Sequence, residues 1–192
     1  MKKFVYFLMA FALLLGACKG NKEEQMFQTT VEQTVQADYT YMSENYDSTF
    51  VWFESSITLK NYIDDENCDG SFVTVRNIFQ TTVPDTADIN TRVIFILHDG
   101  ELINTEEVVG FWTEDLVINP ADITLTYEQA YERLMQADIV KPHSKYCVLR
   151  KPLGPFECNA QYIFGNANST LIFVDAVTGD VSDTDPAFNK RE

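Results

Sequence analysis

Three residues have the types and spacing of the first ligands of a calcium-binding loop: Asp65, Asn67 and Asp69 in the hexapeptide DENCDG. Their side-chain oxygens are hard ligands of the kind that Ca²⁺ binds. The twelfth position of such a loop calls for a bidentate glutamate, but Arg76 stands there and would repel the ion. A polar loop between strands is the alternative interpretation, and a cation site would need a further carboxylate such as Asp64. The sequence leaves this question open.

The two histidines, His98 and His143, offer little support for catalysis or metal binding. Neither lies in an H-E-x-x-H pattern or beside a cysteine at metal-ligand spacing, so we expect imidazoles that are hydrogen-bonded or face solvent. The sequence contains no G-x-S-x-G, no phosphate-binding glycine loop and no nicotinamide fingerprint. Among 29 acidic residues, adjacent pairs carry little information. We therefore expect no catalytic residue, cofactor or metal ligand.

Two cysteines, Cys147 and Cys158, flank the turn-forming segment 151–156 (KPLGPF). Their midpoint falls near the centre of this turn, so a hairpin would bring them face to face. Facing β carbons approach to about 4.5–5.5 Å, close to what a disulfide requires. Two buried thiols are the alternative. Cys68 then either remains a thiol in a polar loop or pairs with another molecule.

The first residues have the parts of a secretory leader: Lys2 and Lys3, then an apolar run at 4–15 that is too short to span a bilayer. The following LGAC, ending on Cys18, resembles a bacterial lipobox, in which the cysteine is acylated and becomes the new N-terminus. This resemblance implies a signal peptide at 1–17 and lipidation of Cys18 by palmitate-like chains. An ordinary cleaved signal with a chance cysteine is the alternative.

Residues 18–25 are polar and predict a lipidated tether. The segment Lys22-Glu23-Glu24 is similar to the acidic stretch after the lipid cysteine in surface-exported lipoproteins of the Bacteroidetes; a solvated linker explains it equally well. We therefore expect an outer-membrane lipoprotein that faces either the periplasm or the cell surface. The net charge of −15 repels phosphate backbones and anionic head groups, which argues against nucleic acid and leaves the lipid as the membrane contact.

Residues 26–119 predict one helix followed by a meander of strands. The helix is indicated by apolar residues at helical spacing (Phe27, Val31, Val35, Tyr39, Met42, Tyr46), with a solvated opposite face (Glu32, Gln33, Gln36, Asp38, Glu44). Strands are predicted at 49–59, 71–83, 92–97 and 107–118, where β-branched and aromatic residues gather. A tight turn is predicted at 98–101.

Residues 120–192 predict the same order again, after a break at 119–122. Thr126 and Gln129 form a potential capping box for a helix. Strands are predicted at 145–150, 160–164 and 170–176. The predicted fold class is therefore α+β, with two repeats of one helix packed on an antiparallel sheet and the two sheets either separate or joined into one.

Residues 126–181 resemble a PepSY-type domain. The resemblance lies in the helix TYEQA, the strand YIF and the final segment VDAVTGDV, with the matching positions Val174, Asp175, Ala176, Thr178, Gly179 and Val181. The D-A-x-T-G pattern predicts a turn in which Asp175 accepts backbone N–H bonds and Gly179 adopts a positive φ. The resemblance implies a peptidase-inhibitory or ligand-binding module, sometimes in tandem, and it brings no catalytic residue.

Adjacent aromatic residues, Trp52-Phe53 and Phe111-Trp112, fall in predicted strands, where neighbours point to opposite faces. An uncovered outer face would suit a peptide, glycan or protein partner; a second layer that covers it is the preferred alternative. The leading hypothesis is a non-catalytic envelope binding module that uses the sheet face and the turn 151–156, with restraint of a peptidase as one form of this role. A surface lipoprotein that binds glycan or nutrient is the second, and a hydrolase with a dispersed site is the third.

Overall fold

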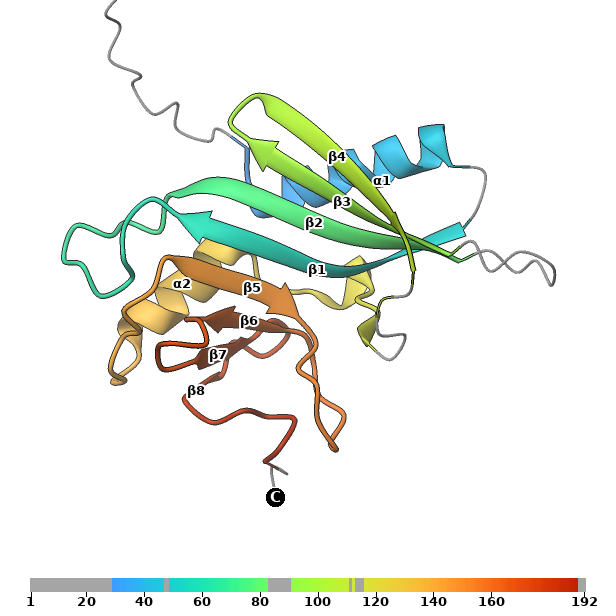
Figure 1. Ribbon diagram of the computed structural model, residues 1–192. Helices are drawn as coiled ribbons and strands as arrows, with labels where there is room; N and C mark the ends of the chain where they lie inside the picture. Colours follow the sequence, from blue (N-terminus) through green and yellow to red (C-terminus); the bar gives the residue numbers. More distant parts are fainter. Residues whose placement is uncertain (1–28, 47–48, 83–90, 111, 113–115, 190–192) are drawn as a thin grey trace, which may run out of the picture.

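The computed structural model describes residues 29–46, 49–82, 91–110, 112 and 116–189. Within them the chain forms one antiparallel sheet of eight strands in the order β4-β3-β2-β1-β5-β6-β7-β8, with two α-helices on one face (Figure 1). The strands are β1 (Thr49–Leu59), β2 (Phe72–Thr82), β3 (Arg92–Asp99), β4 (Leu102–Val109), β5 (Tyr146–Arg150), β6 (Gln161–Phe164), β7 (Ile172–Asp175) and β8 (Val181–Ser182). The helices are α1 (Val31–Asn45), α2 (Tyr127–Gln136) and the short 3-10 helix η2 (Pro120–Asp122).

The predicted fold class, two helix-plus-sheet repeats, is wrong. The described chain is mostly β, with one sheet and only two α-helices. The physical reason lies at β1, which bonds to β2 on one side and to β5 on the other, from the pair Glu54–Arg150 to the pair Thr58–Tyr146. These bonds satisfy backbone groups that an open strand edge would expose, so the ladder runs without interruption from one half of the chain to the other.

Both α-helices begin as their sequences predict. The Thr126 hydroxyl accepts from the Gln129 N–H, and the Gln129 side chain accepts from the Thr126 N–H, which confirms the predicted capping box of α2. Thr30 and Gln33 form the equivalent pair at α1. Each box satisfies N–H groups that a first helical turn leaves without partners. Phe27, the first residue of the predicted stripe, lies outside the described residues.

The fourth strand was predicted at 107–118, but β4 runs from Leu102 to Val109. Asp99 pairs with Leu102 across a two-residue turn that includes Gly100 at φ 59°, so the new strand starts directly after the turn. All eight residues of β4 are exposed. Since neither face is buried, polar residues interrupt the hydrophobic pattern on which the prediction depended.

The main core lies between the two helices and the sheet. It includes Met42 of α1, Leu134 of α2 and Trp52 of β1, all of them buried. Phe53 is also buried, so neither member of this aromatic pair offers an outer surface for a glycan. Trp112 is half-buried and packs edge-on against Phe95. Among the described helices, none combines the length and apolar character that a bilayer crossing requires.

Candidate functional site

A mainly apolar groove lies between α1 and the segment that leads into α2, with a volume of about 570 Å³. Its lining comes from α1, from 119–126 and from the floor strands: Val31, Glu32, Val35, Gln36, Tyr39, Trp52, Asn119, Pro120, Ile123, Thr124, Leu125, Thr126, Leu149 and Tyr162. A volume of this size and a mainly apolar wall with a few polar groups are typical of small-molecule sites.

The groove exists because the two helices cover different strands. Helix α1 packs on β1 and β2, and α2 packs on β7. Between them the sheet presents Trp52 of β1, Leu149 of β5 and Tyr162 of β6 as the floor. The junction of β1 with β5, which joins the two halves of the sheet, therefore also creates the floor of the groove.

Glu32 is the only residue with a carboxylate among the described residues that line this groove. Its Oε1 accepts from the backbone N–H of Tyr127, the first residue of α2, at 2.8 Å. A carboxylate is well placed there, because the first turn of a helix has unpaired N–H groups and a partial positive charge. The hydrogen bonds that described residues make to Glu32 end on Oε1.

Tyr162 closes the floor next to this carboxylate. Its hydroxyl donates to the Leu125 carbonyl at 3.0 Å and lies 3.5 Å from Glu32 Oε1. Burial, and after it the nearby charge of Glu32, raises the pKa of Tyr162 above its usual value. The phenol therefore stays neutral. No cysteine, serine or histidine is found among the described lining residues.

A buried polar cluster lies under α1, away from the groove. Asp38 was predicted on the solvated face of this helix, but it is only 2% exposed. Its Oδ1 lies 2.8 Å from His98 Nε2, and its Oδ2 accepts from Asn77 Nδ2 at 2.7 Å. Thr34 also accepts from Asn77, at 3.1 Å. The cluster was not predicted, although the spacing 31, 34, 35, 38 and 42 places Asp38 at the centre of the buried stripe.

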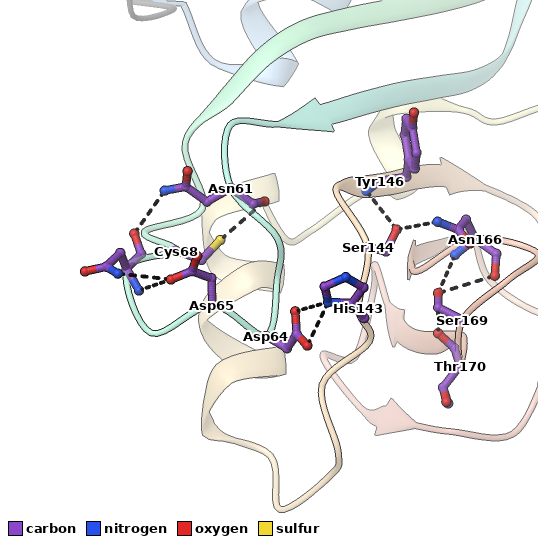
Figure 2. A network of polar contacts seen from close by, with 11 residues as sticks. Asn61, Asp64, Asp65, Cys68, His143, Ser144, Tyr146, Asn166, Ser169 and Thr170 are labelled. Atoms are coloured by element: carbon purple, nitrogen blue, oxygen red, sulfur yellow. Dashed lines mark hydrogen bonds and ion pairs between the residues drawn. The ribbon is translucent and has the colours of Figure 1, made fainter.

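The second histidine, His143, lies in the loops at one end of the sheet (Figure 2). His143 Nδ1 is 3.0 Å from both carboxylate oxygens of Asp64, and its ring stacks on Tyr62 with centroids 4.3 Å apart. The ammonium of Lys145 lies 5.1 Å from the centroid of Tyr62. Both histidines thus have partners, as expected, and both partners are carboxylates.

The aspartates of the possible calcium loop accept hydrogen bonds from backbone N–H groups of the same loop. Asp65 Oδ1 accepts from the N–H of Asn67 at 2.8 Å, and Asp69 Oδ1 accepts from the N–H of Ser71 at 2.9 Å. These backbone hydrogen bonds lower the pKa of both aspartates. In the part of the chain that the structure describes, no three His, Cys, Asp or Glu residues are grouped so as to hold a metal ion.

The cysteines are arranged differently from the hairpin that was expected. Cys147 lies opposite Phe164, not opposite Cys158, because the β5–β6 ladder starts at Arg150–Gln161 and 151–160 forms a longer connection. Cys147 is a free, fully buried thiol, so the facing-position argument for a disulfide is wrong. Cys68 is half-buried, and its Sγ lies 3.9 Å from the Asn61 carbonyl. Cys18 lies outside the described residues.

The D-A-x-T-G turn has the predicted form. Asp175 Oδ1 accepts from the N–H groups of Val177 and Thr178, at 2.9 and 3.0 Å, and Gly179 has φ 78°. The other turn of interest, 151–156, is exposed at Leu153 and at Phe156, whose N–H donates to the Ala187 carbonyl.

The local agreement at this turn concerns its geometry and does not test the resemblance to PepSY-type domains. Comparison of the whole chain with protein-family models, with curated proteins and with solved structures gave no match. The described structure itself offers the groove lined by Glu32 as a candidate binding site.

Proposed function

We propose that this protein is a non-catalytic binding protein of the cell envelope, and that the groove between α1 and α2 takes a small ligand with an apolar body and one amino group. The observation that carries the proposal is the position of Glu32, a carboxylate on the wall of an apolar groove of about 570 Å³. The apolar wall favours an aliphatic or aromatic body. Glu32 Oε2 supplies an acceptor for a cationic donor, and the net charge of −15 attracts cations to the surface.

Decylamine is a suitable probe, titrated into the full chain by calorimetry, with decanol and decanoate as matched ligands of equal length. We expect decylamine to bind more tightly than decanol, and decanoate to bind weakest, because only the amine gains from Glu32. Substitution of Glu32→Gln keeps an acceptor for the Tyr127 N–H but removes the charge, so it should weaken decylamine binding about tenfold, the loss of one charge-assisted contact. Decanol should bind the variant as before.

Glu44→Gln is the matched control, since Glu44 lies on the exposed side of the same helix. It should leave all three affinities unchanged. Equal affinity for the amine and the carboxylate, or equal loss in both variants, would contradict a ligand site at Glu32. The second hypothesis, a glycan surface, receives no support from Trp52 and Phe53, which are both buried.

The compartment is part of the same proposal and rests on the leader residues alone. We propose that Cys18 carries the lipid and holds the domain at the outer membrane. Cys18→Ser should release the protein from the membrane fraction, whereas Cys68→Ser should leave its partition unchanged. A Cys18→Ser protein that stays with the membrane would contradict a lipid anchor at this residue. Restraint of a peptidase, which the PepSY resemblance implies, can be tested separately with the purified chain and a general protease substrate.

A further inference from the structure

The strand β4 is the outermost strand of the sheet on one side, next to β3 (Figure 1). No described strand pairs with its outer edge. Its side chains are exposed on both faces, and apolar residues stand at its two ends, with Leu102 67% and Val109 66% exposed. Natural sheets usually shorten, cover or charge such edges, because the unpaired backbone attracts another strand.

The ladder shows which backbone groups of β4 are open. Arg92 lies opposite Val109, and the N–H of Gly110 donates to the Thr91 carbonyl at 2.9 Å. In an antiparallel ladder alternate residues bond to the same neighbour. The even-numbered residues of β4 therefore bond to β3, and the N–H and C=O groups of Ile103, Thr105, Glu107 and Val109 point outward. A further strand could bond to all four.

The charges of β4 indicate which kind of strand could pair with its outer edge. Glu106 and Glu107 lie in the middle of the strand, between apolar ends. Glu107 is paired with Arg92 at 2.5 Å and accepts from the Tyr46 hydroxyl, while Glu106 is exposed on the opposite face of the strand. A second copy of this chain, paired antiparallel through β4, would place two acidic centres together on molecules that each carry −15. An extended segment with a basic centre fits better.

We propose that β4 binds an extended peptide segment of a partner protein as a ninth strand, with basic residues at the centre of the segment and apolar residues at its ends. Main-chain hydrogen bonds to Thr105 and its outward-facing neighbours supply binding, and Glu106 supplies the preference for a basic centre. The proposal is independent of the groove beside Glu32, which lies between the helices.

The test uses the full chain and a labelled octapeptide, VVKTKTVV, with blocked ends, followed by fluorescence anisotropy. Thr105→Pro removes one outward N–H and leaves the ladder to β3 intact, since proline is tolerated at an edge position of this kind. It should weaken binding about tenfold or more. Thr105→Val keeps the N–H and should bind within about twofold of the natural chain, in line with the small effect of an exposed edge side chain.

A second variant, in which the charge at position 106 is reversed, tests the proposal even if Thr105→Pro disturbs the fold. Glu106→Lys should weaken binding of VVKTKTVV and strengthen binding of the acidic peptide VVETETVV. The proposal is overturned if VVKTKTVV does not bind the natural chain, if Thr105→Pro folds and binds as well as Thr105→Val, or if Glu106→Lys leaves the preference between the two peptides unchanged. A dimer in solution that Thr105→Pro converts to monomer would also overturn it, because the occupant would then be a second copy.

Discussion

Asp38 on α1 and His98 on β3 meet in the interior of the protein, with Asp38 Oδ1 2.8 Å from His98 Nε2. The two residues are 2% and 6% exposed. Asn77 on β2 donates to the other oxygen of Asp38, and Ser55 on β1 donates to Asn77 Oδ1. The helix is thus bonded directly to β3 and β2 and, through Asn77, indirectly to β1. These directional bonds add to the apolar packing and specify the position of the helix along the sheet.

The first prediction follows from the burial of this pair. Asp38→Ala removes the carboxylate beside His98 and one of the two acceptors of the Asn77 amide. Loss of one partner of a buried pair costs about 3–5 kcal/mol. We expect a loss of this size in the free energy of unfolding, measured by urea denaturation. Asp99→Ala, next to His98 but exposed, should cost less than about 0.5 kcal/mol. Equal stability of the two variants would show that the Asp38 contacts contribute little.

The second prediction compares two glycines that both have a positive φ. A Cβ at Gly70 would lie 2.7 Å from Tyr131 Cδ1, whereas a Cβ at Gly100 would meet nothing within 4 Å. Gly100→Ala should cost about 1 kcal/mol from its backbone conformation alone. Gly70→Ala should cost about 1–3 kcal/mol more, because Tyr131 must move. Thermal and urea unfolding of the two variants would measure the difference, and equal losses would argue against close packing at Gly70.

The third prediction concerns Cys147. Burial raises the pKa of its thiol well above the usual value, and the thiolate is the reactive form. In the native protein at pH 8, a thiol reagent should therefore modify Cys147 far more slowly than after unfolding in urea. Peptide mass spectrometry of native and unfolded samples would show this. Peptides that remain linked through Cys147 without reduction would instead demonstrate a disulfide, and would contradict the free thiol in the structure.

The features that sequence alone predicted correctly are local ones. The capping box needs only Thr126 and Gln129, three residues apart, and the turn at Asp175 needs only its own backbone and Gly179. Both depend on short-range sterics and hydrogen bonds that the residue types specify. For this reason they could be predicted without knowledge of the partners that each element meets in the fold.

The features that were missed depend on distant partners. The bonds between β1 and β5 join residues 88 to 96 positions apart. The sequence left open whether the two halves share one sheet, because no local pattern indicates that two such distant strands will pair. Likewise, Asp38 looks like a surface residue by type, and only His98 and Asn77, which come from other strands, make its burial favourable. The groove was missed for the same reason, since its floor lies at the β1–β5 junction.

The last prediction concerns the dependence of stability on pH. Burial pushes the pKa of Asp175 upward, but hydrogen bonds outweigh it and hold the pKa below its usual value. These bonds come from the Thr178 and Val177 N–H groups and from the side chains of Asn159 and Gln161. A depressed pKa in the folded state means that the unfolded chain takes up the proton more readily. The contribution of Asp175 is therefore complete above about pH 4 and is lost as the pH falls through the folded-state pKa.

Asp175→Asn removes this charge and should lower the free energy of unfolding by about 2 kcal/mol at pH 7, because hydrogen bonds to a buried carboxylate are stronger than those to an amide. Between pH 4 and pH 2, about the range in which aspartate titrates, the variant should lose less stability than the natural chain does. Asp138→Asn, at an exposed position, should follow the natural chain throughout. If urea denaturation across this range gave parallel curves for Asp175→Asn and the natural chain, the hydrogen bonds at Asp175 would not favour its charged form.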